Sequence, residues 1–341
     1  MTHRQRIASI FAGKPADRPG FWLGCPSKEI ATALYAHFAV TDDAGLRRAV
    51  DDDFRWIVTD KYYRHPEGKP IFDVMAGKGA RQSLGDPGCF ADCEDTAEVD
   101  RFDWPDPRYL DFDTIRSLAE GTSEYWRLGG TWSMFFHVVS DFFGMENYFI
   151  KMHTNPAVVH AVTRHVVDFY LQANRRAFAE TGDIIDTFFL GNDLGTQRGT
   201  LISPEMFRRF ILPYLKELID QAKSYGKYVQ MHSCGSVAAL IPMLIDAGVD
   251  ALHPLQARAE GMDARSLARQ FRGKLVFVGG VDTQELLWRG TPQQVKDEIA
   301  RLRDIFGQRW VISPSHEAIL PEVPIANVIA MCEAATGKTL H

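Results

Sequence analysis

The two residues whose types and spacing most directly suggest chemistry are His232 and Cys234. They follow the short apolar run 228–231, which predicts a buried strand, and residues two positions apart on a strand point to the same face. One imidazole nitrogen and one thiolate can therefore reach a common point, and both are ligand types that zinc prefers. A histidine and a cysteine at a strand end can also be core residues with only a structural role. The pair alone leaves both interpretations open.

The elements that must position this pair alternate between strands and helices. A parallel sheet covered by helices is the arrangement that such a pattern indicates. Eight repeats favour a single (β/α)8 TIM barrel over residues 1–341, with the Gly-, Pro- and Asp-rich residues 60–108 as an elaborated N-terminal region. An open doubly wound sheet is the alternative, although its GxGxxG fingerprint does not follow the first strand. The predicted strands are 20–24, 54–59, 125–129, 183–190, 228–231, 251–256, 275–282 and 310–316.

Polar residues at the carboxyl ends of these strands are the candidates for catalysis, because barrel enzymes build their sites there. His316 ends the eighth strand, and inward ligands from the fifth and eighth strands could meet over the barrel axis. His232, Cys234 and His316 with an open fourth position would be typical of a catalytic zinc. The other polar residues at strand ends are Asp193, His253, Gln256, Asp282 and Glu317.

Several of the remaining candidates have a structural interpretation beside a functional one. His253 precedes Pro254, and we expect it to serve the turn rather than to bind a metal. Asp193 lies in a glycine-flanked loop, where it either caps the loop or faces the pocket. The consecutive carboxylates 51–53 cannot all face one ion, so we expect a solvated face or a helix end there.

The bulk composition excludes two classes of partner. The net charge of -6, the pI near 6.0 and the dispersed Lys and Arg argue against nucleic acid. No apolar run reaches the roughly 18 residues that span a bilayer, so we expect no membrane partner. Five scattered cysteines do not suggest a disulfide framework, and we expect a cytoplasmic protein.

Three longer motifs carry a family resemblance. Residues 191–197 read Gly-Asn-Asp-Leu-Gly-Thr-Gln, followed by Ile-Ser-Pro-Glu-Met-Phe at 202–207 and Pro-Tyr at 213–214. The opening 6–18 reads Arg-Ile-Ala-x-x-Phe-x-Gly-Lys-Pro-x-Asp-Arg, and 278–282 reads Val-Gly-Gly-Val-Asp, with Gly-Thr-Pro at 290–292. Together they resemble the uroporphyrinogen decarboxylase superfamily over nearly the whole chain. The resemblance implies a single (β/α)8 barrel.

The superfamily has two branches, and the sequence is more similar to one of them. The decarboxylase branch has an Arg-rich N-terminal loop for porphyrin carboxylates, whereas residues 23–28 here contain one Lys and no Arg. The zinc-dependent methyltransferase branch has His-x-Cys on one strand and a third ligand, Cys, in a Pro-Gly-Cys-Gly run. Here Pro-Ser-His316-Glu stands in the place of that run. Zinc accepts His for Cys, and the loss of one negative charge makes it a stronger Lewis acid.

The resemblance therefore implies a zinc-dependent methyltransferase. A methyl group would move between methylcobalamin on a separate corrinoid protein and a thiol or similar acceptor, which reacts as the thiolate that metal coordination favours. The alternative is a cofactor-free decarboxylase of a smaller carboxylic acid, in which a pocket carboxylate protonates the carbanion. A non-catalytic binding protein with the same fold is a third possibility. We expect a small-molecule substrate and a monomer or homodimer.

Roles for individual residues complete the prediction. Asp193 and Asp282 are the expected catalytic carboxylates. Gln256, Trp132 and Gln197 are expected to bind the substrate.

Overall fold

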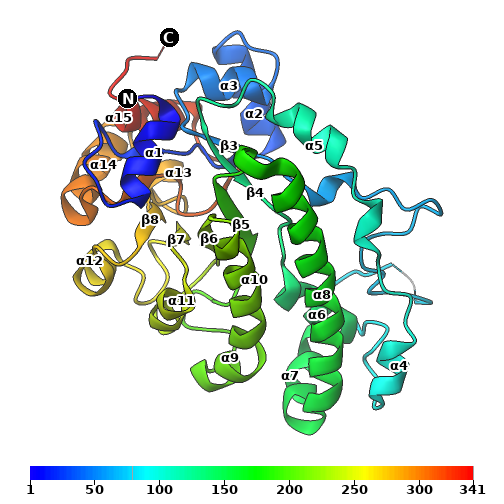
Figure 1. Cartoon of the computed structure of the whole chain (residues 1–341). Coiled ribbons are helices and arrows are strands. Elements are labelled where there is room, and N and C mark those ends of the chain that lie inside the picture. The colour runs from blue at the N-terminus through cyan, green and yellow to red at the C-terminus, as the bar shows by residue number, and fades with distance from the viewer. Residues whose placement is uncertain (79, 341) are drawn as a thin grey trace.

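The computed structural model describes residues 1–78 and 80–340, and it confirms the predicted α/β barrel (Figure 1). Eight parallel strands follow the order β1-β9-β8-β7-β6-β5-β4-β3. Each of the eight predicted runs overlaps one of these strands. The barrel is nearly closed, and Asp53 N–H donates to Phe21 O at 3.0 Å between the two end strands. The strands are β1 (Gly20–Phe21), β3 (Phe54–Trp56), β4 (Trp126–Gly129), β5 (Thr187–Gly191), β6 (Tyr228–His232), β7 (Ala251–Leu255), β8 (Val276–Gly279) and β9 (Trp310–Ile312).

Helices surround the barrel, and their first residues explain where they begin. Asn155 and Thr291 cap α8 and α14 with side-chain hydrogen bonds, and a proline follows each cap at the first helical position. Helices α2 and α3 are separate, because the chain turns between them at Ala39, whose φ is +52°. The helices are α1 (His3–Phe11), α2 (Lys28–His37), α3 (Asp43–Ala49), α4 (Thr96–Asp100), α5 (Phe112–Ala119), α6 (Phe135–Phe143), α7 (Met145–Thr154), α8 (Pro156–Thr181), α9 (Pro204–Phe210), α10 (Leu212–Ser224), α11 (Ile241–Ala247), α12 (Ala264–Phe271), α13 (Leu286–Arg289), α14 (Pro292–Phe306) and α15 (Ile325–Thr336).

Side chains along each strand point alternately into and out of the barrel, which divides the core into an inner cluster and an outer cluster under the helices. Trp22, Phe54 and Phe189 belong to a buried cluster inside the barrel, whereas Val229 and Met231 of β6 pack in the larger cluster under the helices. Residues of α1 join the inner cluster, and Phe11 stacks on Trp126 at the start of β4. Helix α1 therefore closes the amino ends of the strands, which leaves their carboxyl ends for a functional site.

Of the two expectations for residues 51–53, the helix end is confirmed, because they follow α3, and the solvated face is wrong. Asp52 and Asp53 are fully buried. Asp52 pairs with Arg47 at 2.7 Å, and Asp53 pairs with Arg6 at 2.6 Å and Arg18 at 2.8 Å. Arg47 reaches Asp52 from the end of the neighbouring α3, whereas α1 and the segment after it bring Arg6 and Arg18 to Asp53 from distant positions. The two carboxylates therefore form buried ion pairs instead.

A second, two-stranded sheet lies at the carboxyl ends of the barrel strands. Its strands are β2 (Cys25–Pro26) and β10 (Ala318–Ile319), which pair in parallel. This short pairing holds the segment after β9 against the segment after β1. Within the described part of the chain, none of the helices combines the length and apolar character needed for a bilayer span.

Candidate metal centre at the carboxyl ends of the strands

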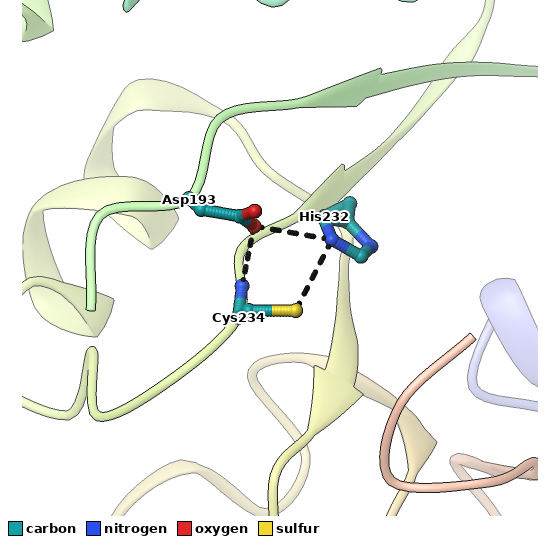
Figure 2. Close-up of side chains that lie close together, drawn as sticks. All are labelled: Asp193, His232 and Cys234. Atoms are coloured by element: carbon teal, nitrogen blue, oxygen red, sulfur yellow. Dashed lines mark hydrogen bonds and ion pairs between the residues drawn. The ribbon is translucent and has the colours of Figure 1, made fainter. Parts of the chain in front are cut away.

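His232 and Cys234 lie at the mouth of the barrel, as their position after an apolar run predicts. His232 is the last residue of β6 and is only 3% exposed, and Cys234 is partly buried two residues further on. Cys234 Sγ lies 3.4 Å from His232 Nε2 (Figure 2). The two potential ligand atoms therefore face a common point.

Asp193, in the loop after β5, completes the first donor group. Its Oδ1 accepts the Cys234 N–H at 2.8 Å and lies 3.1 Å from His232 Nε2 (Figure 2). Two glycines allow this approach, because the loops after β5 and β6 touch through their backbones. A Cβ on Gly195 would lie 2.7 Å from Cys234 O, and one on Gly235, at a φ of +82°, would lie 2.4 Å from Gly195 C.

The segment after β9 brings a second donor group to the same place. The ligand atoms of Cys234, His316 and Glu317 all lie within 4.8 Å of one another. Glu317 Oε2 is 3.8 Å from His232 Nε2 and 3.7 Å from His316 Nδ1. The structure thus brings together the ends of β6 and β9, which are separated in the sheet by β7 and β8.

Glu317 and His316 differ in how ready they are to bind a cation. Glu317 Oε2 is buried and has no hydrogen-bond partner among the described residues. His316 Nδ1 accepts the N–H of Ala318 at 3.1 Å, so the proton of the neutral ring lies on Nε2. The orphaned carboxylate oxygen is therefore the donor that already lacks a partner.

The residues present fit a divalent metal such as zinc. The set offers imidazole nitrogen, thiol sulfur and carboxylate oxygen, which are the atoms that bind zinc in proteins. A buried carboxylate oxygen without a partner is costly unless a cation or a donor compensates it. The donor chemistry and the orphaned Glu317 Oε2 point to the same location.

The electrostatics of the cluster keep the Cys234 thiol protonated when no cation is bound. Burial raises the pKa of Cys234, and the carboxylates of Asp193 and Glu317 raise it further. Burial alone would also raise the pKa of Asp193, but its interactions with His232 and the Cys234 N–H hold it well below its usual range. A cation at this point would reverse the balance at Cys234, because it favours the thiolate.

Aromatic side chains form one wall of the site. The Trp132 ring packs against the backbone of Gly191 and lies 5.3 Å from the His232 ring, between ring centroids. Trp132 also contacts Trp56, and both line a cleft of about 1280 Å³ that reaches Cys25 and Tyr62. The cleft borders the metal cluster through Trp132, which lies beside His232, whereas the residues of the two donor groups do not line it.

The other predicted site residues lie outside the two donor groups. Gln256 Oε1 accepts the N–H of Gly235, so it supports the loop that carries Cys234. Asp282 accepts the backbone N–H groups of Gln284 and Leu286 and lies 3.7 Å from Arg258. The side chain of Gln197 is exposed.

Glu317 within the cluster, and His137 and His253 beside it, were not assigned site roles from the sequence. Glu317 was noticed at a strand end, and its adjacency to His316 was the available signal. Burial lowers the pKa of His137, whose neutral Nε2 accepts the Asp193 N–H at 2.9 Å. His253 Nδ1 lies 3.0 Å from His232 Nδ1. His137 had no signal in the sequence, because α6 reaches the site only through the fold.

The chain belongs to the uroporphyrinogen decarboxylase (URO-D) family, whose model matches residues 89–337. This confirms the resemblance that the sequence motifs carry.

Relatives of known function fall in both branches. Methylcobamide:CoM methyltransferase MtbA of Methanosarcina acetivorans is 25% identical over 193 residues, which cover 56% of this chain and 52% of that protein. Uroporphyrinogen decarboxylase of Chlorobium limicola is 26% identical over 222 residues, which cover 60% of this chain and 57% of that protein. The match thus spans little more than half the length of these curated relatives. A solved methyltransferase from Methanosarcina mazei shares the fold, with a TM-score of 0.67 and 16% identity over 99% of both chains.

Proposed function

We propose that this protein is a zinc-dependent methyltransferase. The methyl group would move between methylcobalamin on a corrinoid partner protein and a thiol or similar heteroatom of a small-molecule acceptor. The observation that carries the proposal is the meeting of His232, Cys234 and the adjacent pair His316 and Glu317 at the mouth of the barrel. Relatives that include methylcobamide:CoM methyltransferases support the choice of reaction.

The metal would be held by His232 and Cys234, with Glu317 as an oxygen donor. His316, the predicted third ligand, would bind through Nδ1 once that atom releases the N–H of Ala318. Bound there, zinc would supply Lewis acidity that favours the thiolate form of the acceptor near neutral pH. Other residues of the chain would hold the ligands in position. Asp193 fixes the backbone of Cys234, and Gln256 holds Gly235 in place.

The surroundings of the cluster suit an acceptor that must be shielded and oriented. The Trp132 ring covers one side of His232 and keeps water from that side. Asp282, after β8 and beside Arg258, is our candidate for orienting a polar group of the substrate, and the exposed Gln197 is a candidate contact at the rim.

The decarboxylase alternative has one observation in its favour, which is that some relatives are uroporphyrinogen decarboxylases. The geometry of the site favours a decarboxylase less than a methyltransferase. Asp193 is one of the two carboxylates, with Asp282, that could protonate a carbanion, but its pKa is held well below the usual range, so it carries no proton near neutral pH. Lys28 in the N-terminal loop is exposed and is the only basic residue of residues 23–28.

Metal content and methyl transfer together test the proposal. Zinc would be measured in the purified protein, in Cys234→Ala and in the matched control Cys25→Ala, which removes another partly buried thiol. We expect zinc in the wild type and in Cys25→Ala, and its loss in Cys234→Ala. Demethylation of methylcobalamin by a thiol, followed by absorbance, should require the same zinc. Full activity in a zinc-free wild-type protein would overturn the proposal.

A further inference from the structure

His232 has a second histidine behind it, on the side away from the donor cluster. His253 of β7 is the register partner of His232, and the two Nδ1 atoms lie 3.0 Å apart. His253 is fully buried, and His232 nearly so. The two imidazoles therefore meet inside the barrel through one nitrogen each.

Two facing ring nitrogens at this distance share one proton. If both carried a proton the N–H groups would collide, and if neither did the lone pairs would repel, so one ring donates and the other accepts. The other nitrogen of His232, Nε2, faces Asp193 Oδ1 at 3.1 Å and Cys234 Sγ at 3.4 Å. A metal at that point needs the lone pair of Nε2, which requires the proton of His232 to lie on Nδ1.

We propose that His253 is a positioning residue that stabilises the metal-binding tautomer of His232 by accepting its Nδ1–H when metal is bound. The inference rests on the metal site of the proposed function. Without metal, the Nε2 proton of His232 faces Asp193, and His253 Nδ1–H donates to His232 Nδ1. With metal, His232 Nδ1–H donates to His253 Nδ1, and the proton of His253 lies on its Nε2. The two rings hold two protons in both states, so only their positions change.

The surroundings of His253 argue against a purely structural role. Its ring packs against Trp22 and Phe189, at centroid distances of 4.7 and 5.7 Å. Its Nε2 is buried and has no hydrogen-bond partner among the described residues, which costs stability that an apolar side chain would not lose. The hydrogen bond that its side chain makes goes to His232, so the benefit of a histidine here lies in what it does for His232.

Zinc affinity in two variants tests this role. His253→Phe keeps an aromatic ring but removes the acceptor, and we expect zinc to bind about 10–100-fold more weakly. His253→Asn places an amide near the position of Nδ1, where it can donate or accept, and we expect affinity within a few-fold of the wild type. His160→Phe removes a histidine that contacts Tyr214 on α10 and serves as the control. Affinities would be measured by competition with a chromophoric chelator, and folding by circular dichroism.

A spectroscopic measurement on the wild type does not depend on how the variants fold. Two-bond ¹⁵N–¹H correlation of histidine-labelled protein distinguishes the two tautomers of His232. We expect the proton on Nε2 without zinc and on Nδ1 with zinc.

The outcomes separate the two proposals. A wild type that binds no zinc overturns both of them. If the wild type binds zinc but His253→Phe binds it equally tightly, or the tautomer of His232 does not change, only the role of His253 is overturned. Failure of His253→Asn to recover affinity also overturns it.

Discussion

Glu317 Oε2 lies 3.8 Å from Nε2 of His232, although His232 ends β6 and Glu317 follows β9, which is not a neighbour of β6 in the sheet. The same oxygen lies 3.7 Å from His316 Nδ1 and makes no hydrogen bond within the described part of the chain. A buried carboxylate oxygen facing two imidazoles is stabilised by a positive charge between them. Glu317 is therefore a candidate metal ligand in its own right beside the predicted His316.

Glu317→Gln should weaken zinc binding by at least about tenfold. Even the mutation of a residue that only hydrogen-bonds to a metal ligand typically lowers the metal affinity by that much. The substitution keeps the size of the side chain and removes its charge. Affinity would be measured by chelator competition, in parallel with His316→Ala. Glu322→Gln, at an exposed position nearby, is the matched control and should bind zinc as the wild type does. Unchanged affinity in Glu317→Gln together with loss in His316→Ala would assign the third ligand to His316 alone.

The barrel could be predicted from the sequence because its signals are local. Each buried strand is a short apolar run, and each cap lies within a few residues of its helix. The position of His232 and Cys234 at a strand end follows from the same local pattern. Asp282 lies beyond the end of β8 at Gly279 rather than at the strand end, and its carboxylate accepts N–H groups of its own loop, which sequence position does not reveal.

Contacts that depend on distant segments could not be predicted. Glu317 is oriented by the pairing of Ala318 with Cys25, which joins opposite ends of the chain. His253 meets His232 only because the register of β6 and β7 sets them side by side. Asp53 looked solvated because its partner Arg6 belongs to a helix that returns to the barrel from the N-terminus. Each of these facts requires the tertiary arrangement.

Gly195→Ala should destabilise the protein and weaken zinc binding. The added Cβ would lie 2.7 Å from both Cys234 O and Ser236 N, which are backbone atoms that cannot move aside cheaply. We expect a loss of about 1–3 kcal/mol in the free energy of unfolding, measured with urea. Gly199→Ala is the matched control, since its Cβ would meet nothing within 4 Å. Equal stability and zinc affinity in the two variants would contradict the close approach of the loops.

Cys25 should resist alkylation at neutral pH in the metal-free protein. Burial raises the pKa of its thiol to about 11; Arg47 opposes this, whereas Glu317 adds to it. Because the thiolate is the reactive form, a raised pKa keeps the rate low at neutral pH, and the rate should rise with pH throughout the range below that value. Iodoacetamide labelling across pH 7–11, followed by mass spectrometry of the Cys25 peptide, measures this. Glu317→Gln should increase the rate at a given pH, and rapid labelling of the wild type at pH 7 would contradict the prediction.

Asp53→Ala should destabilise the fold without weakening the metal site. It would leave Arg6 and Arg18 without their buried partner, and such a loss is worth about 3–5 kcal/mol. Asp113→Ala, whose carboxylate is 93% exposed and pairs with Arg116, should change stability by less than about 1 kcal/mol. Both would be measured by urea unfolding. Because the Asp53 network lies with α1 at the amino ends of the strands, zinc affinity of folded Asp53→Ala should match the wild type. A parallel loss of zinc affinity would show that the two ends of the barrel are coupled.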